Sequence, residues 1–144
     1  MQTACLPSKS DIVKCVHGIS SYYFPMGDRG IKFFKNKAER DYSKLNQHLA
    51  FLAGLAPKDF ETIDSDGYYG YYTESVEMLH NIYSEKEITK KFGRKINELS
   101  DELYYSCDFT VDCNPFNFGI KDGKVVLVDF GYCSYSNYSY FSID

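Results

Sequence analysis

A short hairpin pattern near the C-terminal end is the feature that most constrains the fold of this chain. Two β-prone apolar runs flank the dipeptide Asp122-Gly123, which is a strong signal for a two-residue turn between antiparallel strands. With that turn, the register places Asn117 opposite Val128. Opposed residues in such a ladder lie about 5 Å apart. The sequence therefore predicts that Asn117 and Asp129 meet at the open end of the hairpin.

A further carboxylate lies close to that end of the hairpin. Asp112 precedes Asn117 by five residues, on a stretch stiffened by Pro115, so its side chain can reach the same space. Mg²⁺ prefers a few hard oxygen ligands from the protein together with substrate phosphates. Asn117 and Asp129 are therefore predicted to hold a magnesium ion, with Asp112 nearby.

Composition excludes several classes of protein. The chain has 144 residues, 44% of them apolar, which suits one domain or two small lobes that share a cleft. It has no apolar run of membrane-spanning length and no signal-peptide pattern, which predicts a cytoplasmic protein that does not enter a membrane. Five cysteines without a Cys-x-x-Cys pair favour reduced thiols. A net charge of −4 without a basic stripe argues against nucleic acid as a partner.

The first half of the chain is predicted to form a sheet with one helix packed on it. Period-two patterns and turn residues predict five antiparallel strands, at Ile12–Val16, Ser20–Phe24, Ile31–Phe34, Phe60–Ile63 and Tyr68–Thr73. Between the third and fourth strands, an amphipathic helix is expected from Lys37 to near Gly54. Its apolar stripe consists of Ala38, Tyr42, Leu45, Leu49 and Leu52.

A second helix is predicted after residue 77. Its apolar stripe is Ile88, Phe92, Ile96, Leu99 and Leu103. The helix should end by about Tyr105, and it leads the chain into Phe109-Thr110-Val111 and then into the stretch around Asp112.

The spacing of these motifs resembles a known superfamily. Asp112, four intervening residues, Asn117, a hairpin and then Asp129-Phe130-Gly131 resemble the catalytic loop and magnesium loop of protein kinase-like proteins. The resemblance implies an α+β fold with two lobes: an N-lobe of five antiparallel strands and one helix, and a reduced helical C-lobe whose β-hairpin carries the metal site. The expected divisions are residues 1–73, a hinge at 74–77 and residues 78–144.

The resemblance also implies roles for individual residues, with ATP and Mg²⁺ as cofactors. Asp112 would accept the proton of the attacking hydroxyl, Asn117 would bind one magnesium, and Asp129 would bridge magnesium to the phosphates. Lys32, in Gly-Ile-Lys-Phe-Phe, resembles the strand lysine that holds the nucleotide's phosphates. Its helix partner would be Glu39 or Asp41, and the sequence does not decide between them.

The predicted hinge begins where the fifth strand ends. Tyr72-Thr73-Glu74-Ser75-Val76 resembles the segment of the family that contacts adenine. Thr73 would be the gatekeeper, and the backbone groups of Glu74 and Val76 would contact the base.

The chain departs from the family pattern at several positions. Thr110 replaces the family's histidine, Asn114 replaces a lysine typical of serine/threonine kinases, and Gly18 is the only glycine offered by the expected phosphate loop. Only residues 132–144 follow Gly131, which leaves no space for an Ala-Pro-Glu element or for the helices that hold a peptide. The tyrosine-rich tail is expected either to fold back over the exposed surface or to build a homodimer contact.

Three functional hypotheses follow. The first is a minimal ATP- and magnesium-dependent phosphotransferase that acts on a hydroxyl of a protein substrate, because Lys32, Asp112, Asn117 and Asp129 are all present. The alternative is a pseudokinase-like protein that binds or inhibits a protein partner without catalysis, because the glycine loop and the substrate lobe are missing. The third is an α+β interaction module in which the motif spacings arise by chance.

Overall fold

The computed structural model describes residues 21–65, 67–111, 113–129 and 134–135 of the chain. The first part contains strand β1, strand β2, helix α2, strand β3 and strand β4, with bounds Ser21–Met26, Arg29–Phe34, Lys37–Leu52, Asp59–Ser65 and Tyr68–Glu74. The second part contains β5 (Glu77–Met78), α3 (Leu79–Ile82), α4 (Glu85–Cys107), β6 (Phe109–Thr110), the 3-10 turn η1 (Pro115–Asn117), β7 (Phe118–Lys121), β8 (Lys124–Leu127) and β9 (Ser134–Tyr135).

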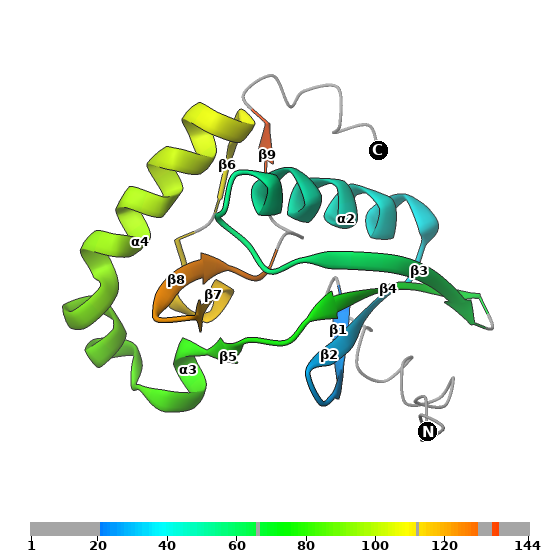
Figure 1. Cartoon of the computed structure of the whole chain (residues 1–144), viewed down its shortest axis with the longest axis horizontal. Helices are drawn as coiled ribbons and strands as arrows, with labels where there is room; N and C mark the ends of the chain where they lie inside the picture. Colours follow the sequence, from blue (N-terminus) through cyan, green and yellow to red (C-terminus); the bar gives the residue numbers. More distant parts are fainter. Residues whose placement is uncertain (1–20, 66, 112, 130–133, 136–144) are drawn as a thin grey trace.

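The first part is an antiparallel sheet with helix α2 lying along one face (Figure 1). Its strands follow the order β1-β2-β4-β3. The positive φ of 84° at Gly27 fits the tight turn between β1 and β2, a conformation that glycine adopts without steric cost. The four later predicted strands and the predicted helix are confirmed within the described residues, where the sheet has four strands. The first predicted strand, Ile12–Val16, lies outside them.

The side of α2 that faces the sheet is polar, which differs from the prediction. Two leucines of the expected apolar stripe are largely exposed, Leu45 at 52% and Leu52 at 67%. The buried residues of the helix are instead Arg40, Ser43, Asn46, Gln47 and Ala50. The apolar residues and the buried polar residues both recur at helical spacing. Periodicity therefore predicted the helix but could not decide which of its two sides faces the sheet. Buried polar side chains are stable where they find hydrogen-bond partners, and the sheet supplies partners for three of them, Arg40, Ser43 and Gln47.

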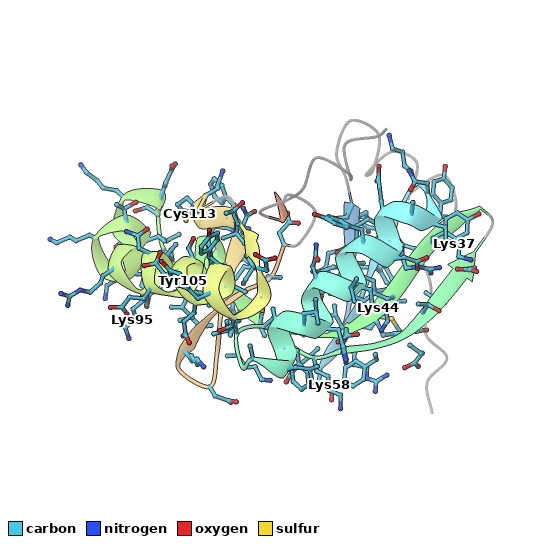
Figure 2. All side chains as sticks on the ribbon, turned by 90° about the horizontal axis from the view of Figure 1, so that it is seen from above. Lys37, Lys44, Lys58, Lys95, Tyr105 and Cys113 are labelled. Carbon is cyan, nitrogen blue, oxygen red and sulfur yellow. The ribbon has the colours of Figure 1, made fainter. Side chains whose placement is uncertain are left out.

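The second part is organised around α4, whose predicted apolar stripe faces the core, with Phe92 partly buried and the other four residues buried. The helix begins with a capping box between Ser84 and Glu87 and ends at Cys107, and the capping residue Asp108 has left-handed backbone angles. Its outer side carries Lys95 and the exposed Tyr105 (Figure 2). The core on its inner side comprises Ala50, Leu55, Ala56, Leu79, Ile88, Ile96, Leu99, Leu103, Phe118, Val125 and Leu127.

The hairpin of β7 and β8 has the register that the sequence predicts. Lys121 pairs with Lys124 and Phe118 with Leu127, and both Asp122 and Gly123 have the positive φ that this turn requires. Strand β5, which was not predicted, adds a third strand beside β7. It approaches so closely that a Cβ on Gly119 would lie 2.8 Å from the carbonyl oxygen of Glu77. Only glycine fits at that position without a shift of the backbone.

Polar contacts fix the hairpin to the first part of the molecule. The backbone N–H of Leu127 donates to the carbonyl of Leu55 at 3.1 Å, and the Lys124 ammonium donates to the carbonyl of Gly54 at 2.8 Å. The hairpin is thereby fastened to the loop that follows α2. Within the described part of the chain, no helix has both the length and the apolar content needed to cross a bilayer.

Candidate nucleotide site

A cavity of about 330 Å³ brings together most of the residues that the sequence singles out. Five predicted site residues line it, and they come from both parts of the molecule: Lys32, Thr73, Glu74, Val76 and Asp129. The remaining lining residues are Ser21, Tyr23, Met78, His80, Asn81, Phe116 and Val128. The predicted lysine, hinge and metal carboxylate therefore share one cavity.

Lys32 connects strand β2 to the end of the hairpin. Its side chain is buried, and its ammonium donates hydrogen bonds to the carbonyl of Val128 and, at 3.3 Å, to the side-chain oxygen of Gln47. Val128 directly precedes Asp129. The cation thus lies beside the residue predicted to bridge magnesium to phosphate, an arrangement suited to neutralising phosphate charge.

The helix residue that contacts Lys32 is Gln47, and not Glu39 or Asp41 as predicted. Glu39 is exposed in the first turn of α2, where its backbone N–H donates to the capping Asn36. The Asp41 carboxylate pairs with Arg40 at 2.6 Å. Gln47 lies eight residues after Glu39, about 12 Å further along the helix axis. The later turns of α2, rather than the first turn, therefore lie next to Lys32. The signal that sequence reasoning missed is a polar stripe at helical spacing, Arg40, Ser43 and Gln47.

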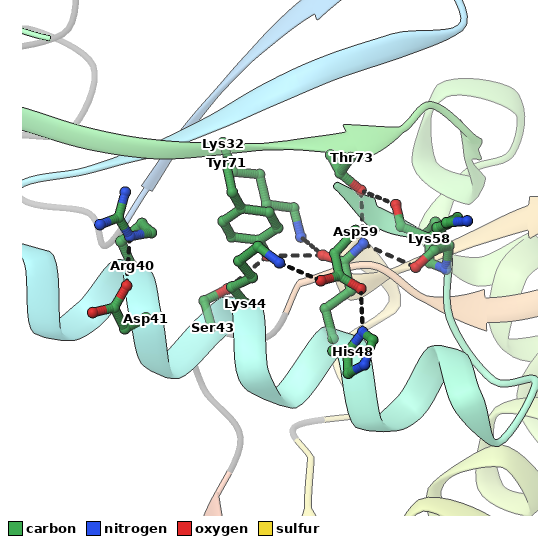
Figure 3. A network of polar contacts seen from close by, with 12 residues as sticks. Lys32, Arg40, Asp41, Ser43, Lys44, His48, Lys58, Asp59, Tyr71 and Thr73 are labelled. Carbon is green, nitrogen blue, oxygen red and sulfur yellow. Dashed lines mark hydrogen bonds and ion pairs between the residues drawn. The ribbon is translucent and has the colours of Figure 1, made fainter. Parts of the chain in front are cut away.

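Thr73 occupies the predicted gatekeeper position and is held by the same network. Lys32, Tyr71 and Thr73 point from the sheet toward α2 (Figure 3). The Thr73 hydroxyl accepts a hydrogen bond of 2.7 Å from the Gln47 amide and lies 3.3 Å from the carbonyl of Lys58, to which it donates. Its conformation is therefore fixed at the back of the cavity.

The Glu74 side chain joins the two parts of the molecule at the predicted hinge. Its carboxylate pairs with Lys121 of β7 at 2.7 Å and accepts from the backbone N–H of Lys58 at 3.1 Å. Burial alone would raise the pKa of Glu74, but Lys121 and the Lys58 N–H outweigh burial and hold this pKa below its ordinary value. The side chain is therefore held in this structural pairing, and the backbone N–H of Glu74 is bonded as well, to the carbonyl of Lys58 at 2.9 Å.

Tyr23 forms one wall of the cavity, which the sequence did not indicate. Its ring lies directly over Gly30, where a Cβ would come within 2.2 Å of the phenol oxygen. The hydroxyl shares a hydrogen bond of 2.7 Å with the Ser75 hydroxyl in the hinge. A second bond, from the Ser75 N–H to the carbonyl of Asp28 at 2.9 Å, ties the hinge to the β1–β2 turn. Tyr23 thus connects β1 to the hinge across the cavity.

Asn117 and Asp129 meet at the open end of the hairpin, as the register predicted. The carbonyl of Asn117 accepts from the backbone N–H groups of Val128 and Asp129, at 2.8 and 3.3 Å. These bonds place the two residues side by side through their main chains, and a magnesium ion held by their side-chain oxygens stays a prediction. Asp112 lies outside the described residues, and among those described no three His, Cys, Asp or Glu side chains gather into a metal site.

The short strand β9 lies beside the segment that precedes Asp112. Ser134–Tyr135 of β9 pairs antiparallel with Phe109–Thr110 of β6, two residues before Asp112 in the sequence. A tail that folds back over the protein, one of the two alternatives expected for residues 132–144, would begin with a pairing of this kind. Residues 136–144 lie outside the described part, so the homodimer contact stays a prediction.

Comparison with known proteins supports the fold. No protein family model matches the chain, and no curated protein matches it. Among solved structures, the bifunctional kinase-methyltransferase WbdD is similar, with a TM-score of 0.57, 18% identity and 84% of this chain covered. Monomeric WbdD gives a TM-score of 0.55 at 22% identity over 87% of the chain, and a complex of WbdD with the kinase inhibitor LY294002 gives 0.54 at 19% identity over 83%. The chain spans about a third of the length of these proteins, 31%, 36% and 32% respectively. The likeness supports a kinase-like α+β fold.

Proposed function

We propose that this chain is a minimal kinase-like phosphotransferase that uses ATP and Mg²⁺ and acts on a hydroxyl of a protein substrate. The observation that carries the proposal is the position of the Lys32 ammonium, bonded to the carbonyl of Val128 directly before Asp129. This cation and this carboxylate line the same cavity as the hinge residues Thr73, Glu74 and Val76. Phosphoryl transfer depends mainly on such positioning and charge neutralisation.

The residues of the cavity divide into two ends. At the hinge end, the main chain of Glu74 and Val76 would contact the base, with the Tyr23 ring as one wall of the cavity. At the other end, Lys32 would hold the phosphates. Magnesium bound by Asn117 and Asp129 would neutralise charge on the transferred group. Asp112 is proposed to accept the proton of the attacking hydroxyl.

A thermal-shift titration tests the nucleotide site. Purified protein is melted with ATP, with and without Mg²⁺, beside the variant Asp129→Asn. A ligand that binds only the folded state adds about 2.7 kcal/mol of stability at a hundredfold excess over its dissociation constant. We expect a magnesium-dependent rise in melting temperature in the unchanged protein and its loss in Asp129→Asn, because that variant keeps the shape of the side chain but removes the charge.

Asp101→Asn is the matched control, because Asp101 is an exposed carboxylate on α4 away from the cavity. It should retain the full shift. Absence of any shift at millimolar ATP in the unchanged protein would overturn the proposal, as would a shift that survives unaltered in Asp129→Asn.

One observation favours the alternative function, a pseudokinase-like protein that binds a protein partner. The helix partner of Lys32 is the neutral Gln47, where the family resemblance predicted a carboxylate. Incubation with radiolabelled Mg-ATP and a generic protein acceptor separates the two functions. Phosphate transfer that disappears in Asp112→Asn supports catalysis. Nucleotide binding without transfer or hydrolysis supports the alternative.

A further inference from the structure

Gln47 is the most completely bonded polar side chain at the candidate site. It is fully buried in the middle of α2. Its side-chain oxygen accepts from the Lys32 ammonium at 3.3 Å and from the Tyr71 hydroxyl at 2.7 Å. Its side-chain nitrogen donates to the carbonyl of Pro57 at 2.9 Å and to the Thr73 hydroxyl at 2.7 Å. All four hydrogen-bonding positions of the amide are therefore used.

The partners of Gln47 fix the orientation of its amide. Lys32 carries an ammonium that only donates, and Pro57 contributes a carbonyl that only accepts. A flipped amide would oppose donor to donor and acceptor to acceptor at these two contacts. The oxygen of Gln47 must therefore face Lys32, and its nitrogen must face Pro57.

The same geometry explains why an amide occupies this position rather than a carboxylate. A glutamate at position 47 would place a carboxylate oxygen about 2.9 Å from the Pro57 carbonyl, where two acceptors would be buried against each other. Buried polar atoms without a complementary partner are costly. The Pro57 carbonyl therefore favours a neutral residue at position 47, one that accepts a hydrogen bond from Lys32 and donates one to the loop.

We infer that Gln47 is a positioning residue that holds the Lys32 ammonium at the phosphate end of the cavity. The inference rests on the proposed function, because Lys32 has this importance only if the cavity binds a nucleotide. Through Thr73 and Pro57, Gln47 anchors Lys32 to the gatekeeper position and to the loop before β3. Thr73 also donates to the carbonyl of Lys58, a bond that does not depend on Gln47, so loss of Gln47 should affect binding of the phosphates far more than binding of the base.

Affinities for Mg-ATP and for adenosine separate these two contributions, measured by calorimetry on the full chain. Gln47→Asn shortens the side chain by one methylene, so the amide cannot reach both Lys32 and Pro57. We expect it to weaken Mg-ATP binding about tenfold, the size of one lost hydrogen bond to a charged group, with adenosine affinity unchanged. Gln47→Glu keeps an oxygen within reach of Lys32 but opposes the Pro57 carbonyl, so it should lower the melting temperature while the folded variant retains most of the preference for ATP.

Ser43→Ala is the matched control. Ser43 is also buried in α2, and its hydroxyl shares a hydrogen bond of 3.0 Å with the Tyr71 hydroxyl. Unlike Gln47, it makes no direct hydrogen bond to Lys32 within the described network. This variant should lower the melting temperature without changing the ratio of ATP to adenosine affinity. In a Lys32→Ala background, Gln47→Asn should have no further effect on that ratio, because Gln47 acts through Lys32.

The outcomes distinguish this inference from the proposed function. Equal affinities for ATP and adenosine in the unchanged protein would overturn both. If the ratio of ATP to adenosine affinity falls in Lys32→Ala but stays unchanged in folded Gln47→Asn, the inference alone is overturned. It is also overturned if each substitution lowers this ratio by the same factor in the presence and in the absence of the other.

Discussion

Helices α2 and α4 have similar sequence patterns but are held in the fold by different forces. Each has apolar residues at three- and four-residue steps, and each begins with a side chain that caps the third backbone N–H, Asn36 in α2 and Ser84 in α4. In α4 the apolar stripe is buried against the hairpin. In α2 two leucines of the stripe face solvent and the polar side of the helix is buried.

The difference follows from what each helix packs against. Helix α4 covers the apolar side of the β7–β8 hairpin, so burial of hydrocarbon is enough to hold it. Helix α2 covers the side of the sheet that presents Lys32, Tyr71 and Thr73. A helix over these groups must offer them hydrogen-bond partners, since buried polar groups without partners are costly. The inner side of α2 is thus polar because the sheet presents polar groups to it.

The largest effect is expected from a truncation in the apolar helix. Leu103 is fully buried in the core between α4 and the hairpin. Leu103→Ala should cost about 2–5 kcal/mol, because it removes buried methyl groups and leaves a cavity. Urea unfolding followed by circular dichroism measures this loss. A cost below about 1 kcal/mol would mean that α4 is not held mainly by burial.

A smaller effect, with a distinct pH dependence, is expected on the side of α2. The Asp59 carboxylate of β3 is 1% exposed and pairs with Lys44 at 2.6 Å and His48 at 3.0 Å, both on α2. Burial alone would raise the pKa of Asp59, but the hydrogen bonds and charges of Lys44 and His48 outweigh it and hold the pKa below its ordinary value. A lowered carboxyl pKa stabilises the fold at pH values above about 4, the ordinary pKa of aspartate, and this contribution is lost as the pH falls through the lower pKa of the folded state.

Asp59→Asn tests that contribution through stability measured across pH. Near neutral pH the variant should be less stable by about 1.5–3 kcal/mol, the size of a hydrogen bond to a charged group. The gap between the two proteins should narrow below pH 4, where the carboxyl of the unchanged protein takes up a proton. A gap that stays constant between pH 3 and 7 would show that Asp59 contributes packing rather than charge.

Local chemistry explains which parts of this fold the sequence predicts well. The Asp122-Gly123 turn sets the register of β7 and β8 by itself, so the meeting of Asn117 with Asp129 could be predicted from neighbouring residues. The inward face of α2 could not, because an apolar stripe and a polar stripe recur at the same spacing. The hydrogen bond from Lys32 to Gln47, in place of one to Glu39 or Asp41, could not be predicted either, because it depends on where α2 crosses β2, and that crossing is a tertiary contact between residues distant in the sequence.

The smallest effect is expected on the outer stripe of α2, and it gives the comparison its sharpest test. Leu45→Glu and Leu52→Glu replace leucines that are 52% and 67% exposed with a residue of similar helix propensity. Each should change the free energy of unfolding by no more than about 0.5 kcal/mol. The same substitution at Leu103 should unfold the protein, because it buries a charge among hydrocarbon. A loss of 2 kcal/mol at Leu45 or Leu52 would mean that these leucines are covered in solution, and that α2 is held by apolar burial as α4 is.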